Sequence, residues 1–368
     1  MYGGIYQDNR VFVTGHTGFK GSWLTVFLET LGAEIAGFSL GIPTQPAHFP
    51  LLKAKLRQDL SGDINNFQTV KKALAGFAPD IVFHLAAQPI VRLSYDLPLQ
   101  TFQTNIIGTA NVLEAAVQTP SVKAVVVITT DKCYTNRNSD WGYNAAPFVE
   151  SGTLGGIDPY SASKACAEIV ADSYRQRTDI PIATCRSGNA VGGGDWAAER
   201  LIPNLIRSVN GEAAKIRMPD ATRPWQFVLE PLHGYLLLGA KMLAEGRDYG
   251  ECWNFGTGLE ANVPVAGIAA LAAKQWDKIH YETEVVPDDR RCEASLLMLD
   301  SSKAYRRLHW QPLWSLERSI EETVRWYRDF YRNGTVRTRE QIGEWSGECA
   351  SKGQTLSVQT HSFRPQTE

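Results

Sequence analysis

The sequence has no run of about 18 apolar residues, the length that a helix needs to span a bilayer. Residues 1–15 also lack a basic segment followed by a long apolar stretch, so they do not resemble a secretory signal. Neither charge is in excess, because 37 basic and 39 acidic residues leave a net charge of -2. This balance gives no sign of a surface that binds nucleic acid or an anionic membrane. We therefore expect a cytoplasmic protein with neither partner.

Paired cysteines are also missing. The six cysteines, at positions 133, 166, 185, 252, 292 and 349, show no Cys-x-x-Cys spacing and have no histidine at metal-ligand spacing. We therefore predict reduced, structural thiols and no metal site. Residues 351–368, in which Ser, Gln, Thr and Pro predominate, are predicted to form a disordered tail.

The chain contains 43% hydrophobic and 21% charged residues, a composition typical of soluble globular proteins. Its length of 368 residues is enough for two lobes. Strand and helix patterns alternate through residue 190, which predicts an α/β fold with a Rossmann-type doubly wound parallel sheet. We place a dinucleotide-binding domain in residues 1–190, with sheet contributions from about 225–260. A smaller mixed α/β lobe, mainly residues 190–345, is expected to cap the carboxyl edge of the sheet and bind the substrate.

The apolar runs and the helical periodicity predict individual elements. The predicted strands are Arg10–Thr14, Glu34–Leu40, Leu56–Leu60, Pro79–Gln88, Val125–Lys132 and Pro181–Arg186. The predicted helices are Ser22–Leu31, Leu97–Val117, one that begins near Asp158, Arg200–Val209, Leu232–Glu245, Val265–Trp276 and Leu316–Phe330.

A glycine-rich turn follows the first strand directly and has the sequence Gly15-His16-Thr17-Gly18-Phe19-Lys20-Gly21. A strand, such a turn and a helix form a dinucleotide-binding unit, because missing side chains let a pyrophosphate approach the backbone N–H groups. The spacing is G-x-x-G-x-x-G rather than G-x-G-x-x-G. No acid or arginine occurs at Phe38, Ser39 or Leu40 to select NAD or NADP, so the residues leave that choice open.

Two later segments are predicted to complete the cofactor site. Asp63 and Ile64, after the third strand, would present a carboxylate and an apolar side chain to the adenine. Ala86 and Ala87, at the end of the fourth strand, are small enough to allow close contact with the cofactor.

The stretch from Val125 to Glu168 holds the predicted chemistry. A buried strand ends in Thr130, Asp131 and Lys132, which puts polar groups at its carboxyl end. Tyr160 and Lys164 stand four residues apart at a predicted helix start, so the phenol and the ammonium share a face.

These motifs resemble those of the extended short-chain dehydrogenase/reductase superfamily. The matching residues are Thr14-Gly15-x-x-Gly18-x-x-Gly21, Asp63-Ile64, His84-Leu85-Ala86-Ala87, Asn105 and Tyr160-x-x-x-Lys164. Thr130-Asp131 is similar to the sugar-nucleotide 4,6-dehydratases, most of which continue with glutamate where this chain has Lys132. Gly192-Gly193-Gly194-Asp195-Trp196 and Arg223-Pro224-Trp225 resemble the CDP-glucose 4,6-dehydratases in particular.

The resemblance implies that NAD oxidises carbon 4 of the glucose of CDP-D-glucose, that water leaves across carbons 5 and 6, and that the hydride returns to carbon 6. The product would be CDP-4-keto-6-deoxy-D-glucose, a precursor of deoxysugars such as those of lipopolysaccharide O-antigen. Tyr160 is the expected base for the 4-hydroxyl, although a free phenol has a pKa of about 10. Lys164 is expected to favour the phenolate and bind the nicotinamide ribose, and Thr130 to hydrogen-bond near the 4-hydroxyl.

Asp131 is the expected acid for the departing 6-hydroxyl, which requires a protonated carboxyl. Lys132 is harder to interpret, since an ammonium is not a base. We hypothesise that it acts on carbon 5 either as a neutral amine or by stabilising the enolate electrostatically. His16 replaces a small residue of most relatives and is predicted to crowd the pyrophosphate and weaken dinucleotide binding.

The predicted substrate-binding residues are mostly polar or basic. The guanidinium group of arginine can bind phosphate through two parallel hydrogen bonds. The expected diphosphate ligands are therefore Arg223 and one of Arg290 and Arg291. Gln88, Asn189 and Arg200 are further predicted contacts.

Several alternatives remain open on the residues alone. A UDP-N-acetylglucosamine 4,6-dehydratase also shows Asp-Lys at this position, whereas a 4-epimerase would leave Asp131 without a role. A non-catalytic NAD-sensing protein on the same fold is the alternative outside enzymes. The superfamily commonly dimerises through helices like Leu97–Val117 and the one from Asp158, so a homodimer or a dimer of dimers is expected.

Overall fold

The computed structural model describes residues 1–136, 146–284 and 297–354. Its centre is a seven-stranded sheet with the strand order β11-β6-β5-β4-β1-β2-β3, in which every neighbouring pair is parallel. The strands are β1 (Arg10–Thr14), β2 (Glu34–Ser39), β3 (Gln58–Ser61), β4 (Ile81–His84), β5 (Ala124–Ile128), β6 (Ile182–Ser187) and β11 (Cys252–Phe255). The predicted doubly wound parallel sheet is confirmed.

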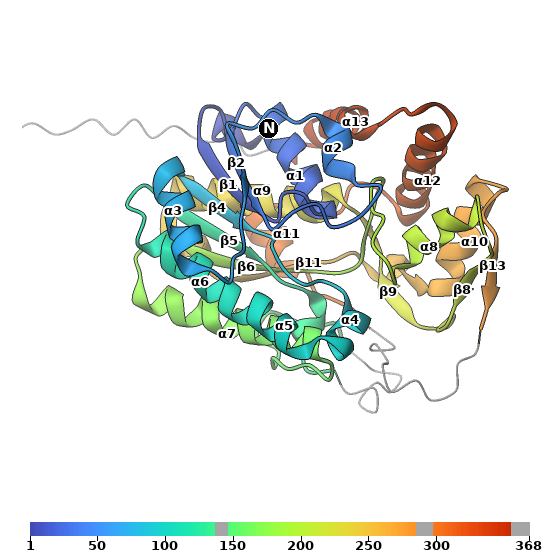
Figure 1. Ribbon diagram of the computed structural model, residues 1–368, viewed down its shortest axis with the longest axis horizontal. Coiled ribbons are helices and arrows are strands. Elements are labelled where there is room, and N and C mark those ends of the chain that lie inside the picture. Colours follow the sequence, from blue (N-terminus) through green and yellow to red (C-terminus); the bar gives the residue numbers. More distant parts are fainter. Residues whose placement is uncertain (137–145, 285–296, 355–368) are drawn as a thin grey trace, which may run out of the picture.

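Helices cover both faces of this sheet (Figure 1). One face carries α3 (Phe67–Phe77), α6 (Gly108–Val117) and α7 (Pro159–Arg177), and the other carries α1 (Phe19–Thr30), α9 (Leu229–Glu245), α11 (Ser302–Leu308) and α13 (Thr338–Ser351). Successive strand residues point to opposite faces, so each face has its own core. In β1, Phe12 packs in the core under α3 and α6, whereas Val11 packs in the core that includes α1 and α9.

The smaller lobe lies beside the carboxyl edge of the sheet (Figure 1). Its short ladders are parallel β8 (Ala214–Ile216) with β13 (Tyr281–Thr283), antiparallel β9 (Thr222–Pro224) with β12 (Asn262–Pro264), and parallel β7 (Ala190–Val191) with β10 (Gln226–Phe227). Its helices are α8 (Leu201–Ser208), α10 (Val265–Gln275) and α12 (Leu316–Asn333). The expected mixed α/β lobe is present, and the domain boundaries at 190 and 345 stay a prediction.

Several helical segments differ from the expectation, among them α3, α11 and α13, which were not predicted. The stretch Leu97–Val117 is not one α-helix, because α5 (Pro98–Phe102) and α6 are joined by a π-helical turn, Gln103–Ile107. This turn contains the buried Asn105. Helix α13 was not predicted, because its apolar positions are few. It packs on α1, where Arg339 forms an ion pair with Glu29 of that helix.

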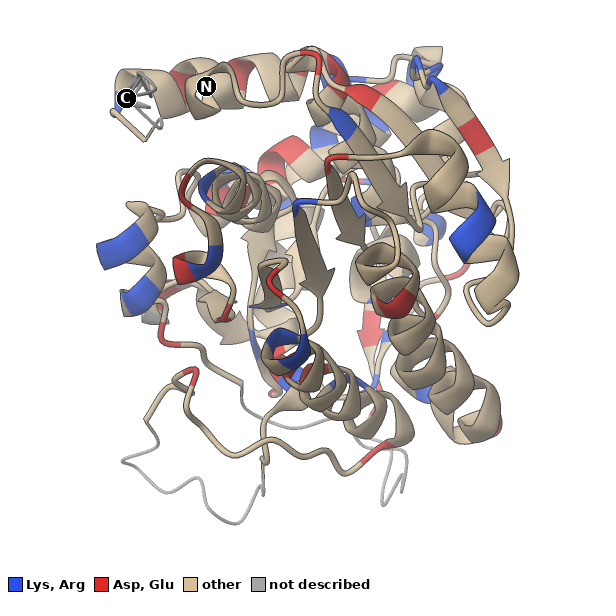
Figure 2. Cartoon of the chain, turned by 90° about the vertical axis from the view of Figure 1, so that its left-hand side faces the viewer, with Lys and Arg blue, Asp and Glu red and all other residues tan. Residues whose placement is uncertain are grey.

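Within the described ranges, no helix is both long and apolar enough to cross a membrane. Figure 2 shows Lys and Arg interspersed with Asp and Glu on the face that it presents, in agreement with the balanced composition. The tail was predicted for residues 351–368, but Ser351 is the last residue of α13 and Gln354 is buried. Residues 355–368 lie outside the described residues, as do Arg290 and Arg291.

Candidate active site

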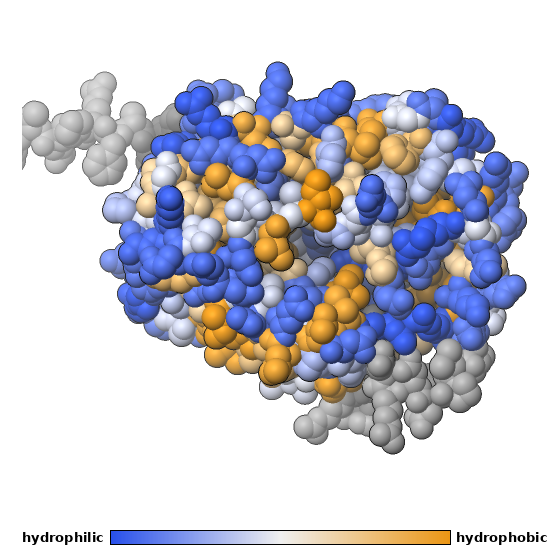
Figure 3. Space-filling view, in the orientation of Figure 1, coloured by the Kyte–Doolittle hydropathy of each residue, from blue (hydrophilic) through white to orange (hydrophobic). Residues whose placement is uncertain are grey.

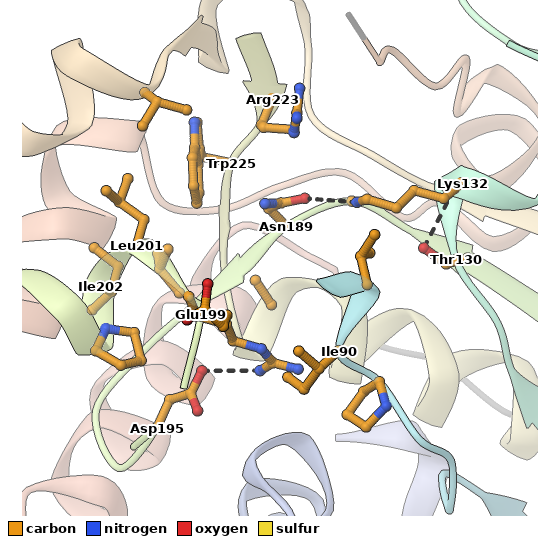
Figure 4. A pocket seen from close by; sticks show the side chains of 18 of the residues that line it. Ile90, Thr130, Lys132, Asn189, Asp195, Glu199, Leu201, Ile202, Arg223 and Trp225 are labelled. Carbon is orange, nitrogen blue, oxygen red and sulfur yellow. Dashed lines mark hydrogen bonds and ion pairs between the residues drawn. The ribbon is translucent and has the colours of Figure 1, made fainter. Parts of the chain in front are cut away.

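A cavity of about 440 Å³ lies between the carboxyl ends of β5 and β6 and the lobe. This is the edge of an open α/β sheet at which ligands generally bind. Figure 4 shows residues from both sides of it, among them Thr130 and Lys132 from the sheet and Leu201 and Trp225 from the lobe. The predicted site residues that line the cavity are Phe19, Thr130, Asp131, Lys132, Tyr160, Asn189, Arg200 and Arg223.

The end of β5 turns sharply and points its polar side chains into the cavity. Asp131–Cys133 form a 3₁₀ turn, and the Thr130 hydroxyl caps it by accepting from the Lys132 N–H at 3.3 Å. The Thr130 Oγ1 also donates to Asp131 Oδ1 at 3.0 Å. Asp131 is fully buried, and its Oδ2 has no hydrogen-bond partner in the described part of the chain. A buried oxygen without a partner fits a site that a ligand hydroxyl completes.

Lys132 extends from the same turn toward Asn189 (Figure 4). Its Nζ lies 3.4 Å from Asn189 Oδ1 and 3.5 Å from Asp131 Oδ1. The segment after β6 therefore positions Lys132 beside the carboxylate, as well as contributing Asn189 to the cavity wall.

Tyr160 and Lys164 stand on the first turns of α7, which begins with Pro159 and is capped by Asp158. Burial raises the pKa of the Tyr160 phenol, and its hydrogen bond with Thr130 is the largest opposing influence, followed by the charge of Arg200. Burial lowers the pKa of Lys164 to about 8. The Lys164 Nζ donates to the Ile128 carbonyl at 3.0 Å. The Thr130 hydrogen bond is thus the largest of the influences that lower the phenol pKa here, and the expected influence of Lys164 stays a prediction.

The glycine-rich turn has the shape that a pyrophosphate requires. Gly15 has φ +73°, and a Cβ there would lie 2.7 Å from the backbone nitrogen of Ala86. A Cβ on Gly21 would collide with the Gly15 carbonyl. Helix α1 begins at Phe19, and no side chain caps it at Gly18, so its first N–H groups are open to an anion. These residues fit a dinucleotide pyrophosphate.

The His16 ring packs on β2, and its predicted effect on the pyrophosphate stays a prediction. The ring is 1% exposed and lies over β2, where Nδ1 is 2.9 Å from Ser39 Oγ and Nε2 is 2.9 Å from Asp59 Oδ1. The ring is therefore at the end of β2, where the ribose of a dinucleotide would lie and where no acid or arginine was found in the sequence. Thr17 is held in the same region through its hydroxyl, which donates to the Gly41 carbonyl at 2.7 Å.

Asp59 is an acid at this position that the sequence did not reveal. The fingerprint places the acid on the second strand, and here β3 supplies it instead. The parallel pairing of β2 with β3 brings Asp59 next to Gly37, and hence to His16.

The remaining predicted cofactor residues, Asp63, Ile64, Ala86 and Ala87, lie in the segments after β3 and β4 and contact neighbouring parts of the chain. Asp63 Oδ1 accepts from the Asn65 N–H at 2.9 Å, and Ile64 is buried against Gly108 of α6. Ala86, with Ala87 after it, follows β4 and donates its N–H to Thr14 Oγ1 at 3.2 Å.

Asn105 links the segment after β4 to α7 through hydrogen bonds. Its Oδ1 accepts from the Gln88 N–H at 2.8 Å, and its Nδ2 donates to Ser163 Oγ at 2.9 Å. The Gln88 side chain is held by Thr101 and by the Ile90 N–H, and Gln88 is not among the residues that line the cavity. Its predicted substrate contact therefore has no support in this arrangement.

The predicted phosphate-binding arginines divide into two groups. Arg223, 4% exposed, and Arg200, whose guanidinium lies 2.9 Å from Asp195, both line the cavity. Arg290 and Arg291 lie outside the described residues.

Lys20 lines the cavity but was not among the predicted site residues. It stands inside the glycine-rich motif, yet its Nζ reaches the end of β6 and donates to Ser187 Oγ at 2.9 Å. Burial, together with the charge of Arg200, lowers its pKa to about 7. Its place in the motif, between Gly18 and Gly21, could have indicated a cavity residue, because this part of the chain lies near the carboxyl ends of the strands.

The sequence profile of the GDP-mannose 4,6 dehydratase family matches residues 12–323. A CDP-glucose 4,6-dehydratase from Salmonella typhimurium is 42% identical over 340 residues, which cover 89% of this chain and 93% of that protein. The chain belongs to the sugar-nucleotide 4,6-dehydratase family. Among relatives of this family, a dTDP-glucose 4,6-dehydratase from Haemophilus influenzae is 29% identical, with 72% of this chain and 81% of that protein covered.

One solved structure agrees with this assignment, and a second shares the fold. DesIV, the dTDP-glucose 4,6-dehydratase of Streptomyces venezuelae, crystallised with NAD, matches with a TM-score of 0.75 and 25% identity. The match covers 92% of this chain and 99% of DesIV. The epimerase Mth375 from Methanothermobacter thermautotrophicus shares the fold, with a TM-score of 0.77, 24% identity and coverage of 93% and 96% of the two chains. The predicted resemblance and the enzyme class are confirmed.

Proposed function

We propose that this dehydratase converts CDP-D-glucose to CDP-4-keto-6-deoxy-D-glucose. The observation that carries the proposal is that Tyr160, Thr130 and Asp131 line one cavity, and that one carboxylate oxygen of Asp131 is buried without a partner among the described residues. The similarity to the Salmonella enzyme supports CDP-glucose as the substrate.

NAD is the proposed cofactor, and when bound it would supply the acceptor and later the donor of the hydride. Gly15, Gly18, Gly21 and the N–H groups at the start of α1 would hold its pyrophosphate. Lys164 would hold the nicotinamide ribose. The fit of the glycine turn and the NAD-bound DesIV relative both support this choice.

The side chains divide the proton transfers among themselves. Tyr160 accepts the 4-hydroxyl proton, and Asp131 gives a proton to the departing 6-hydroxyl. Thr130 couples the two, because its single hydroxyl proton is donated either to Asp131 or to Tyr160. A protonated Asp131 no longer needs that proton, so Thr130 is then free to stabilise the phenolate.

Lys132 acts on carbon 5. Its Nζ contacts the carboxylate of Asp131, so the residue proposed to act on carbon 5 lies beside the acid proposed to act on the 6-hydroxyl. Elimination of water across adjacent carbons requires this proximity. Arg223 and Arg200, together with Asn189, hold the diphosphate end of the substrate.

Product analysis tests this function directly. The protein is incubated with NAD and either CDP-glucose or UDP-N-acetylglucosamine, and the ultraviolet absorbance of a 4-keto sugar is measured in base. We expect the signal with CDP-glucose. A signal with UDP-N-acetylglucosamine alone would instead identify the alternative dehydratase, and recovery of a 4-epimer would identify an epimerase.

We also propose a homodimer, with a dimer of dimers as its extension, and a cytoplasmic role in deoxysugar synthesis such as that for O-antigen. Exposed apolar side chains support the dimer: Leu97, Leu99, Ile107 and Ile169 are 42 to 81% exposed on α5 to α7 and the adjoining turns. Figure 3 shows hydrophobic residues over the part of this face where α5 and α7 lie in Figure 1. Burial of such a patch in a dimer would remove it from water.

A further inference from the structure

One hydrogen-bonded pair at the end of β2, His16 and Asp59, has no role in the reaction described above. The Nε2 of His16 lies 2.9 Å from Oδ1 of Asp59, and its Nδ1 lies 2.9 Å from Oγ of Ser39. Since a carboxylate only accepts hydrogen bonds, Nε2 carries the hydrogen and Nδ1 accepts from the Ser39 hydroxyl. The imidazole therefore links the carboxylate of Asp59 to the last residue of β2.

The imidazole is held by packing as well as by these hydrogen bonds. It lies over Gly37 of β2, where a Cβ would come within 2.4 Å of His16 Cδ2. Phe49 of α2 (His48–Leu52) packs against it, with 4.8 Å between the ring centroids and an interplanar angle of 90°. Gly37 is also the register partner of Asp59 in the parallel pairing of β2 with β3. The missing side chain of Gly37 thus makes room for the ring beside Asp59.

The two members of the pair differ in exposure and in charge. The His16 side chain is 1% exposed, whereas that of Asp59 is 59% exposed. Burial lowers the pKa of His16, and the hydrogen bond with Asp59 only partly opposes this, so the ring is neutral at pH 7. In the part of the chain that the structure describes, no lysine or arginine forms an ion pair with Asp59. Asp59 therefore presents a negative charge to solvent beside the end of β2.

A charge at this place bears on the choice of dinucleotide. In dinucleotide-binding folds, an acid near the end of the second strand accepts from the ribose 2′-hydroxyl of NAD, whereas an arginine there accommodates the 2′-phosphate of NADP. Here β2 ends at Ser39 and is followed by Leu40, which is 73% exposed, so neither residue carries a charge. Asp59, on the neighbouring strand, supplies the charge instead.

We propose that Asp59 selects NAD over NADP, by accepting a hydrogen bond from the ribose 2′-hydroxyl and by repelling a 2′-phosphate. This rests on the proposed binding of a dinucleotide at the glycine-rich turn. A phosphate monoester carries about -1.5 to -2 charges at pH 7, so the carboxylate repels it and offers it no hydrogen-bond donor. A hydroxyl, by contrast, donates to the carboxylate. The selecting acid thus comes from β3 and not from the second strand.

Calorimetric titration of the full-length protein with NAD and with NADP tests the selection without substrate or turnover. We expect the wild type to bind NAD at least about tenfold tighter than NADP. Asp59→Asn keeps the shape of the side chain and still accepts from His16 Nε2 through its amide oxygen, but it removes the charge. We expect NADP to bind this variant about tenfold tighter than the wild type, and NAD affinity to change by less than about threefold.

A charge series and two controls separate the charge of Asp59 from the packing around it. Asp59→Lys puts a cation at the same position, so we expect NADP affinity to rise in the order Asp, Asn, Lys. Ser39→Ala removes the other hydrogen bond of the His16 ring without changing any charge. Asp179→Asn removes an exposed carboxylate that pairs with Arg247. Both controls are expected to leave NADP affinity within about twofold of the wild type.

The proposal is overturned if Asp59→Asn binds NADP within twofold of the wild type, or if either control raises NADP affinity as much as Asp59→Asn does. Equal affinity of the wild type for NAD and NADP also overturns the selection, while the proposed reaction stands. A wild type that binds neither dinucleotide overturns the proposed cofactor, and the selection with it.

Discussion

The Lys132 Nζ lies 3.5 Å from Oδ1 of Asp131, so the two side chains proposed to act in the elimination contact each other. The same Oδ1 accepts from Thr130, whereas Oδ2 is buried without a partner among the described residues. Burying an unsatisfied oxygen costs about 1–3 kcal/mol. A ligand hydroxyl that reached Oδ2 would recover part of this free energy.

Asp131→Asn separates the oxidation from the elimination. The amide cannot protonate the departing hydroxyl, so we expect formation of the 4-keto-6-deoxy product to fall by about 10²–10⁴-fold. Oxidation at carbon 4 continues, because Tyr160 is intact, and absorbance of reduced cofactor accumulates at 340 nm under about one turnover. Asp195→Asn is the matched control, because Asp195 is a second cavity carboxylate that is paired with Arg200. An Asp131→Asn variant that makes product at the parental rate would remove the acid role.

Lys132 is tested through the carbon-5 proton. We expect Lys132→Gln to slow exchange of this proton with solvent by about 10²-fold or more, measured by deuterium incorporation into the product. Lys132→Arg distinguishes the two hypotheses, since guanidinium keeps the positive charge but does not act as a base. Retained exchange in Lys132→Arg indicates electrostatic stabilisation, whereas loss in both variants indicates a neutral amine. Parental exchange in Lys132→Gln would contradict both.

Thr130→Val changes the pH dependence of the oxidation. Burial already raises the pKa of Tyr160, and the Thr130 hydrogen bond opposes this by stabilising the phenolate. Removing the hydroxyl raises the phenol pKa further, so the rising limb of kcat/KM against pH moves to higher pH. Valine keeps the shape of the side chain, and Tyr160→Phe is expected to remove the limb together with the activity. An unmoved limb in Thr130→Val would show that Thr130 does not act on the phenol.

The strands and the main helices were predictable because their signals are local. The apolar run of β1, the glycine turn and α1 follow one another along 21 residues, from Arg10 to Thr30. Tyr160 and Lys164 were predictable as a pair for the same reason, since helix geometry alone places residues four apart on one face. Asp158 and Pro159 at the start of α7 gave its beginning.

The parts that the sequence did not give depend on contacts between distant residues. Lys20 reaches Ser187, 167 positions away, and His16 meets Asp59 over a separation of 43. Glu199 meets Arg92 only because the lobe folds back over the sheet. No periodicity carries such information, which is why the contact of His16 with Asp59 was not predicted and why Lys20 and Asp59 were missed.

His16→Gly tests the predicted effect of this residue on the cofactor. The ring packs against Gly37 of β2 and pairs with Asp59 of β3, so its removal opens the end of β2, where the ribose of a dinucleotide would lie, and releases that carboxylate. We expect NAD to bind about tenfold tighter by titration, one decade in Kd. Thr17→Ser, which keeps the hydroxyl bonded to Gly41, serves as the control in the same turn. Unchanged NAD affinity in His16→Gly would refute the crowding hypothesis.

A buried ion pair behind the site is expected to hold β6 against α7. Glu168 Oε2 lies 2.9 Å from Arg186 Nη2, the two side chains are 1% and 3% exposed, and Glu168 also accepts from Thr129 and Thr184. Arg186→Met leaves the carboxylate buried without its cation, so the free energy of unfolding by urea at pH 7 should fall by about 3–5 kcal/mol. Lys241→Met, which breaks the exposed pair with Glu245, should change it by less than about 0.5 kcal/mol.

The pH dependence gives this prediction a second readout. In the wild type, Arg186 holds the pKa of Glu168 below its ordinary value against the effect of burial. The pair therefore stabilises the fold above the unfolded pKa of about 4.3, and its contribution is lost as the pH falls through the lower folded pKa. In Arg186→Met, burial is no longer opposed by the guanidinium, so the folded pKa rises and protonation relieves the buried charge. The stability deficit of the variant should consequently shrink between pH 7 and pH 5, and a deficit independent of pH would show that lost packing, rather than the unpaired carboxylate, destabilises it.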